Sequence, residues 1–294
     1  MSPEPRNGPV AVVGDDGGAV VELVESMGLR TVSGEPTDHE EATVAIAIGE
    51  PALFEVAREW PTTPILPVDV SAGHQAVPPG ALQSALGHLA DGTYTIQNQP
   101  LLSVTLDGDP VGTAVSDVML VTAEPAHISE YTVERPAESI STFRADGVVV
   151  ATPAGSAGYA RQVGGPILSP DVAALSVVPI GAFKTERDHW VVSVPEETWA
   201  LNLSVEREEA PVSLLVDGHD TRRVAADEQL TLAHGGVISL MSVPESESVY
   251  RPLGDRPHTT RTVDDRGSTD FASSPETQSS EESARLPDAS FPRE

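Results

Sequence analysis

The first 90 residues alternate short apolar runs with segments that carry apolar residues at helical spacing. Such alternation is typical of a parallel sheet covered by helices. Strands are expected over 10–13, 43–48 and 65–70, and helices over 19–27, 51–60 and 79–89. We therefore expect an α/β, Rossmann-like domain over residues 9–92.

The pattern changes near Thr93, where apolar runs become separated by Gly, Pro and Asp turns and no long helix is indicated. Strands are expected over 102–106, 118–122, 148–151, 190–194, 199–205, 212–216 and 230–232. Residues 93–250 are thus expected to form a second, β-rich domain. The remaining 251–294 are rich in Ser, Thr, Pro and charge, which predicts a disordered acidic tail, and 1–8 are expected to be flexible.

Composition excludes several classes of function. The chain has no Cys, so it contains no disulfide, thiolate metal site or Cys nucleophile. Its formal charge of −28 repels phosphate backbones, which argues against a nucleic-acid partner. The first residues, MSPEPRNGP, do not resemble a signal peptide, and no apolar run has spanning length. A cytoplasmic protein without a membrane partner is expected.

The acidic charge also predicts a dependence on salt. Acidic residues number 45 against 17 basic ones, they are spread along the chain, and Lys184 is its only lysine. High salt screens self-repulsion, so this composition fits a halophilic protein. We expect the chain to unfold when ionic strength is lowered, which circular dichroism at decreasing salt would measure. Full stability at about 10 mM salt would contradict the expectation.

One stretch, DGVVVATPAGSAGYARQVGGP over 146–166, carries the clearest functional signal. A buried-type strand over 148–151 opens into a loop of small residues and then Tyr159. Gly and Ala let a ligand approach the backbone closely. A surface turn between two strands would explain the same composition.

The order of residues in this stretch resembles the signature of the ATP-dependent NAD kinases. Segments 114–118, 178–180 and 216–218 follow in the order and spacing of that family. The resemblance implies an NAD kinase-like two-domain fold with an interdomain cleft, in which an α/β N-terminal domain precedes a β-rich C-terminal one. It further implies phosphorylation of the NAD 2′-hydroxyl to give NADP, with ATP as donor, Mg²⁺ as cofactor and a homo-oligomeric assembly.

The family's Gly-Gly-Asp-Gly turn corresponds here to Ile48-Gly49-Glu50-Pro51. In the family this turn holds donor phosphates and its Asp acts as general base. By resemblance, Gly49 is a candidate phosphate contact and Glu50 the candidate catalytic base. An ordinary helix start explains the same residues, because Glu and Pro are both favoured in a first turn.

The resemblance also assigns dinucleotide contacts to Asp117, Asp146, Ser156 and Tyr159. Tyr159 suits stacking on a base or ribose, and a core tyrosine is the alternative. For Asp146 the alternative is a hairpin turn with the following glycine. No metal ligand set is predicted.

Several family contacts are replaced. Ser116 occupies the position of an Asn in the family. Residues 154, 157 and 158 lack hydroxyl groups that the family has there. The segment 68–75 lacks the family's Asn and most of its glycines. Two functions remain open: a diverged NAD kinase with Glu50 as base, or a catalytically impaired relative that binds a nucleotide as a sensor or regulatory protein. An active enzyme requires that Glu50 face the small-residue loop.

Overall fold

The computed structural model describes residues 8–15, 17–32, 41–60, 62–124, 127–136, 138–183, 188–194, 199–207, 210–226 and 228–251. The N-terminal strands form a parallel sheet in the order β2-β1-β3-β4. Their bounds are β1 Val10–Val13, β2 Thr31–Val32, β3 Val44–Ile48 and β4 Ile65–Val68. Nearly continuous apolar strands suit a sheet that is covered on both faces.

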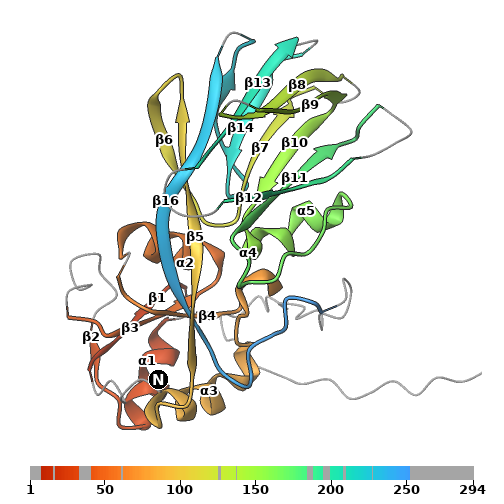
Figure 1. Ribbon diagram of the computed structural model, residues 1–294. Helices are drawn as coiled ribbons and strands as arrows, with labels where there is room; N and C mark the ends of the chain where they lie inside the picture. The colour runs from red at the N-terminus through yellow and green to blue at the C-terminus, as the bar shows by residue number, and fades with distance from the viewer. Residues whose placement is uncertain are drawn as a thin grey trace, which may run out of the picture. The chain divides into compact units, whose positions relative to one another are not determined.

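Helices cover both faces of this sheet (Figure 1). They are α1 Gly17–Ser26, α2 Glu50–Glu59 and α3 Leu82–Ala90, with single 3₁₀ turns η2 Ala72–His74 and η3 Pro79–Ala81. Helix α2 buries Leu53 and Val56 on one face, while Val24 of α1 and Leu86 of α3 pack on the other. The expected α/β topology is confirmed.

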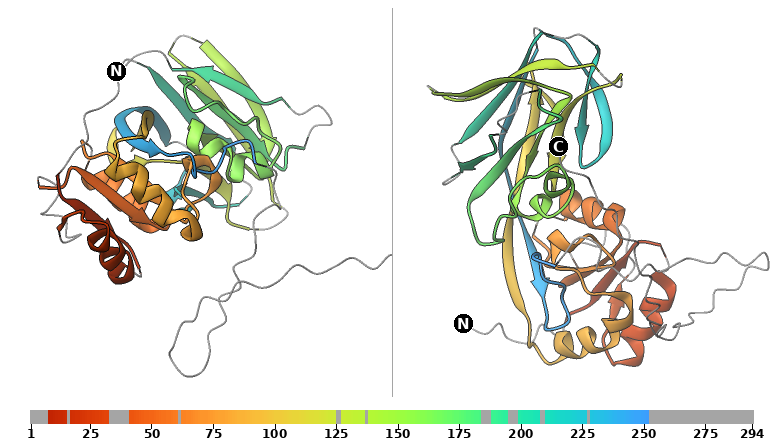
Figure 2. Two further views of the ribbon diagram at one scale, coloured as in Figure 1. Left: turned by 90° about the horizontal axis from the view of Figure 1, so that it is seen from below. Right: turned by 90° about the vertical axis from the view of Figure 1, so that its right-hand side faces the viewer.

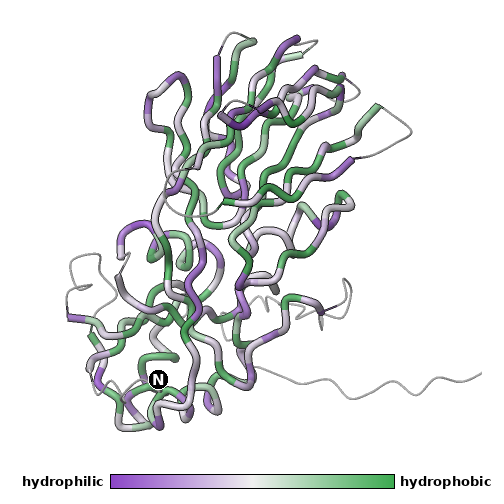
Figure 3. The backbone as a smooth tube through the Cα atoms, viewed as in Figure 1, coloured by the Kyte–Doolittle hydropathy of each residue, from purple (hydrophilic) through white to green (hydrophobic). Residues whose placement is uncertain are grey.

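The following β-rich region is built from two sheets packed face to face. One, in the order β12-β11-β10-β7-β14-β15, contains β7 Asp117–Thr122, β10 Gly147–Ala151, β11 Ala174–Ile180, β12 Trp190–Ser193, β14 Val212–Val216 and β15 His219–Val224. The other contains β5 Thr95–Leu106, β6 Asp109–Ala114, β8 Ser129–Arg135, β9 Glu138–Ala145, β13 Ala200–Arg207 and β16 Gln229–Ser242. Apolar side chains from both sheets form one core. Figure 3 shows hydrophobic residues, in green, along many of these strands.

Two long antiparallel strands, β5 and β16, connect the two regions. They pair from Leu106 and Leu230 at one end to Thr95 and Ser242 at the other. Figure 1 and the right view of Figure 2 show them running side by side. The far end of β16 adds to the parallel sheet beside β4, so the region 229–243 contributes to both cores.

The structure corrects three expectations. The strand expected over 230–232 extends to Ser242. The loop over 153–162 contains two helical turns, α4 Pro153–Ser156 and α5 Tyr159–Gln162. Asp146-Gly147 is not a hairpin turn, because β9 and β10 belong to different sheets.

Some expectations fall outside the described residues: the flexible 1–7, the tail beyond 251, and Lys184. Within the described ranges, no helix combines the length and apolar character that crossing a bilayer demands.

Candidate functional site

The segment 115–117, at the start of β7, is held by the carboxylate of Asp217. Oδ1 of Asp217 accepts hydrogen bonds from the backbone N–H groups of Val115 at 3.1 Å, Ser116 at 2.7 Å and Asp117 at 3.3 Å. Asp217 N–H in turn donates to the Asp117 carbonyl at 2.9 Å. The Asp217 side chain is fully buried. Three adjacent amides therefore converge on one carboxylate, which fixes the backbone of this segment.

Arg58 of α2 completes the arrangement. Its Nη2 lies 2.5 Å from Asp217 Oδ2, and its Nε donates to the carbonyl of Thr113 at 2.9 Å. The guanidinium also lies over the ring of Phe54, 5.7 Å from the centroid. Helix α2 is thereby fastened to the β-rich region at two adjacent points.

A second link joins His74 to Ser116. His74 Nε2 lies 3.0 Å from Ser116 Oγ, and the imidazole packs edge-on against Phe54. The ring is 1% exposed, and its Nδ1 has no partner among the described residues. Burial lowers the pKa of His74 to about 4, against a smaller opposing effect of the Glu50 charge. The imidazole is therefore neutral at physiological pH.

The turn carrying His74 lies against the small-residue loop at backbone distance. A Cβ on Gly73 would stand 1.8 Å from the carbonyl oxygen of Ala154, and one on Gly155 would stand 2.0 Å from that of Ser116. Thr152 caps α4 by accepting from the Gly155 N–H at 3.1 Å. Its hydroxyl donates to the Val115 carbonyl at 2.9 Å. Small residues here serve close packing between chain segments.

Glu50 begins α2 and is exposed. Gly49 precedes it with φ 82°, a value that favours glycine. The Gly49 N–H donates to the Val68 carbonyl at 2.9 Å, so this amide is used within the sheet. Pro51 has no N–H, which leaves the amides of Glu50 and Ala52 as the first-turn donors for an anion.

Asp117 is affected by charges from both the α/β region and the β-rich region. Burial, together with the charges of Asp217 and then Glu50, raises its pKa to about 7. The Glu50 charge acts on both Asp117 and His74. Phe54 and Arg58 of the same helix contact His74 and Asp217, so α2 lies close to the segment 115–117. A carboxyl group that titrates near neutrality can both donate and accept a hydrogen bond from a sugar hydroxyl.

The two site residues in the loop differ in exposure. Ser156 is fully buried, and its hydroxyl donates to the Pro153 carbonyl at 2.7 Å and accepts from the Leu168 N–H at 2.9 Å. This hydroxyl therefore holds the loop rather than facing a ligand. Tyr159, at the start of α5, is 38% exposed, which excludes the alternative of a core tyrosine.

Asp146 lies apart from these residues. It precedes β10, whereas Asp117 pairs with Ala151 at the other end of the same strand. Five residues of strand separate the two ends, or about 17 Å. The Asp146 carboxylate lies against Gly181, where a Cβ would stand 2.3 Å from it. The structure thus brings Glu50 and Asp117 toward each other but not Asp146.

A hollow of about 290 Å³ lies between α2 and β15. Pro51, Phe54, Glu55, Arg58, Glu59 and His219 line it. His219 Nδ1 lies 3.0 Å from the Asp217 carbonyl oxygen, so the imidazole is fixed beside the Arg58 pair. In the described part of the chain no three His, Asp or Glu side chains are grouped to hold a metal ion.

Sequence reasoning missed His74, Arg58 and Asp217 as members of the site. His74 shows no metal-ligand spacing, and Arg58 lies within a helix that reads as amphipathic. The sequence indicates Asp217 only as part of the segment 216–218, which resembles the family in order and spacing. Its φ of 50° and that of Gly218 at 77° suit the tight turn that aims the carboxylate inward, and this Asp-Gly pair was the available signal.

Residues 115–237 match the family described as the ATP-NAD kinase C-terminal domain. The chain is 37% identical over 131 residues to the NAD kinase of Methanosarcina acetivorans, covering 45% of this chain and 46% of that protein. With the NAD kinase of Methanothermobacter thermautotrophicus it shares 38% over 117 residues, which is 40% and 41% of the two chains. The chain thus spans about half the length of the curated relatives it matches.

Two solved structures share the fold. The crystal structure of yeast NADH kinase complexed with NADH superposes with a TM-score of 0.67 at 15% identity, covering 82% of this chain and 86% of that one. An NAD kinase from Archaeoglobus fulgidus in complex with ATP gives 0.63 at 18% identity, covering 80% and 92%. The α/β region followed by two β-sheets is therefore the NAD kinase fold. Over residues 115–237, the chain is similar to the C-terminal domain of NAD kinases.

Proposed function

We propose that the protein binds NAD and transfers the γ-phosphoryl group of ATP to its 2′-hydroxyl, giving NADP. The observation that carries the proposal is the placement of Glu50. Glu50 follows β3 at the start of α2, and its charge acts on both Asp117 and His74, so the carboxylate lies near the segment that follows β6. Similarity to NAD kinases over residues 115–237 supports the reaction class, and the Glu50 carboxylate is a group able to accept the proton.

In this mechanism Glu50 accepts the proton of the 2′-hydroxyl while that oxygen attacks the γ-phosphorus of ATP. The bond from the γ-phosphorus to the bridging oxygen breaks, and ADP leaves. Asp117 and Ser116 hold the ribose hydroxyls, since both lie at the fastened start of β7. Tyr159, exposed at the start of α5, covers a base or ribose by stacking.

A divalent cation would be held chiefly by the phosphates of the nucleotide, where it would neutralise charge during phosphoryl transfer. Mg²⁺ is usually held by substrate phosphates and one or two carboxylates rather than by a closed protein cage. The described residues contain no such cage. Asp217 is occupied by Arg58 and by backbone amides, so it is not a free ligand. A homo-oligomeric assembly is part of the same proposal, because the resemblance to NAD kinases implies one.

The test is to measure NADP formation from NAD, ATP and Mg²⁺ in molar salt, with NAD binding followed in parallel by calorimetry. We expect turnover together with saturable NAD binding. Binding without turnover would overturn the kinase assignment and identify a nucleotide-binding sensor. Absence of both would show that the site accepts another ligand.

A further inference from the structure

Asp217 and Arg58 form more hydrogen bonds and ion pairs than a hairpin turn or a surface helix requires. A buried carboxylate is costly to desolvate unless its oxygens are satisfied. Asp217 meets that need with three consecutive backbone amides and one guanidinium. Hydrogen bonds from amides to an ionised acceptor are stronger than neutral ones. The segment that includes Ser116 and Asp117 therefore has a backbone position dictated by this one side chain.

The guanidinium group that pairs with Asp217 belongs to Arg58, which lies in the α/β region. Arg58 lies two turns after Glu50 on α2. With its planar fork it bonds two groups at once, the carboxylate of Asp217 and the carbonyl of Thr113. Helices resist bending over so short a length, so a displacement of Arg58 carries Glu50 with it.

We propose that Arg58 and Asp217 form a positioning pair that sets the backbone of residues 115–117 and ties it to the helix carrying Glu50. Neither residue needs to touch the ligand. Their effect is to fix the position of residues 115–117 relative to the helix that carries Glu50. This matters because misplacement by about 1 Å is enough to impair catalysis. In its link to NAD the proposal rests on the proposed function, whereas the bonded geometry does not.

The proposal has an electrostatic consequence that packing alone would not produce. The Asp217 charge raises the pKa of Asp117, as the Glu50 charge does to a lesser extent. The charges of Asp217 and Glu50 both act on Asp117. Arg58 forms an ion pair with Asp217, and the neutral His74 is hydrogen-bonded to the adjacent Ser116. An Asp217→Asn substitution keeps the size of the side chain but removes its charge. It should therefore lower the pKa of Asp117.

The first measurement needs no ligand. The carboxyl carbon of Asp117 is followed by ¹³C NMR against pH in the full chain at molar salt. For Asp217→Asn we expect the midpoint to fall by about one unit, because the repelling charge has gone. For Arg58→Ala we expect it to rise, because Asp217 keeps its charge and loses its partner. Unfolding curves of each variant establish that it is folded.

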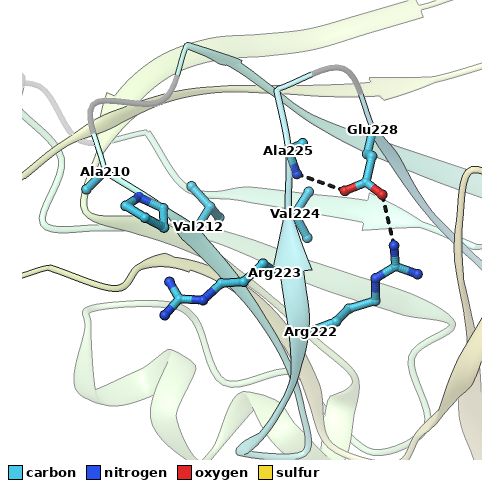
Figure 4. A pocket seen from close by; sticks show the side chains of 8 residues that line it. Ala210, Val212, Arg222, Arg223, Val224, Ala225 and Glu228 are labelled. Atoms are coloured by element: carbon cyan, nitrogen blue, oxygen red, sulfur yellow. Dashed lines mark hydrogen bonds and ion pairs between the residues drawn. The ribbon is translucent and has the colours of Figure 1, made fainter.

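The second measurement is NAD affinity by calorimetry. We expect Arg58→Ala to weaken binding about tenfold and Arg58→Lys to restore part of it, since lysine keeps the charge but not the two-pronged bond. The matched control is Arg222→Ala. Arg222 of β15 pairs with Glu228 (Figure 4), and both line a hollow of about 500 Å³. Arg222 lies opposite Leu214, which lies opposite Leu120, farther along β7 than residues 115–117. This control should leave both measurements at wild-type values.

The outcomes separate the two proposals. If folded Arg58→Ala and Asp217→Asn variants keep the wild-type Asp117 midpoint, the positioning pair is refuted. If the midpoints move but the wild type binds no NAD, the proposed function fails and the pair stands as a positioning device for another ligand. Should Asp217→Asn not fold, the Arg58 variants decide the matter alone, by midpoint and by affinity.

Discussion

Glu50→Gln should abolish NADP formation while leaving NAD binding within about threefold of wild type. Loss of a positioned general base costs roughly 10²–10⁴ in rate. The substitution preserves the size of the side chain and its place at the start of α2, where Glu50 is exposed and has no packing role. The measurement is kcat for NADP formation together with NAD affinity on the same preparation.

The matched control is Glu22→Gln. Glu22 is exposed on α1, in the same region of the fold, so the same chemical change is made away from the site. Its kcat should equal that of wild type. If Glu50→Gln retains turnover, Glu50 is not the base. A lowered pKa of Asp117 in that variant would still establish that the Glu50 charge reaches the segment 115–117.

The elements of the α/β region were predictable because parallel strands buried on both faces are continuous apolar runs. The strand expected over 10–13 agrees with β1 at both ends, and the helix expected over 51–60 differs from α2 by one residue at each end. Local pattern is sufficient there, since the same residues that favour the element also bury it.

The β-rich region was less predictable for a physical reason. Strands β8 and β9 carry Ser, Thr and Glu on a face that is only partly buried, so their composition resembles that of loops. In β16 the pair Gly235-Gly236 reads as a break. In the structure it is a bulge, where a Cβ on Gly235 would stand 2.5 Å from the amide nitrogen of Ser103 and the strand continues beyond.

The site was only partly predictable because its contacts join residues distant in sequence. Arg58 and Asp217 are 159 residues apart, and His74 and Ser116 are 42 apart. Motif resemblance proposes Glu50 and Asp117, which lie at the ends of recognisable strands. It could not locate the residues that hold them, since those are defined by packing between regions. Ser156 kept the motif's residue type and yet has a structural role.

His74 and Asp117 should give the protein two opposing dependences of stability on pH. The pKa of His74 is lowered from 6.5 to about 4, so between these values the unfolded chain binds more protons and stability falls as pH falls. The pKa of Asp117 is raised from 3.8 to about 7, so the native state binds more protons and stability falls as pH rises. Between pH 4 and 7 the two contributions largely cancel.

Single variants should expose each dependence. Asp117→Asn removes the carboxyl titration and leaves that of His74 unopposed. Relative to wild type, its stability should fall by about 4 kcal/mol as pH is lowered from 7 to 4, because the offsetting contribution of Asp117 is missing. His74→Gln should behave in the opposite way. Relative to wild type, it should lose about 3 kcal/mol as pH rises over the same interval, because the offsetting contribution of His74 is missing.

The measurement is the free energy of unfolding by urea in molar salt at pH 4.5, 5.5 and 6.5 for wild type, both variants and the double variant. Taking differences from wild type removes the titration of every other carboxylate, which all four proteins share. The two single variants should diverge in opposite directions, and the double variant should run parallel to wild type. Parallel curves for all four would show that neither group titrates abnormally, and with that the electrostatic description of the site would fail.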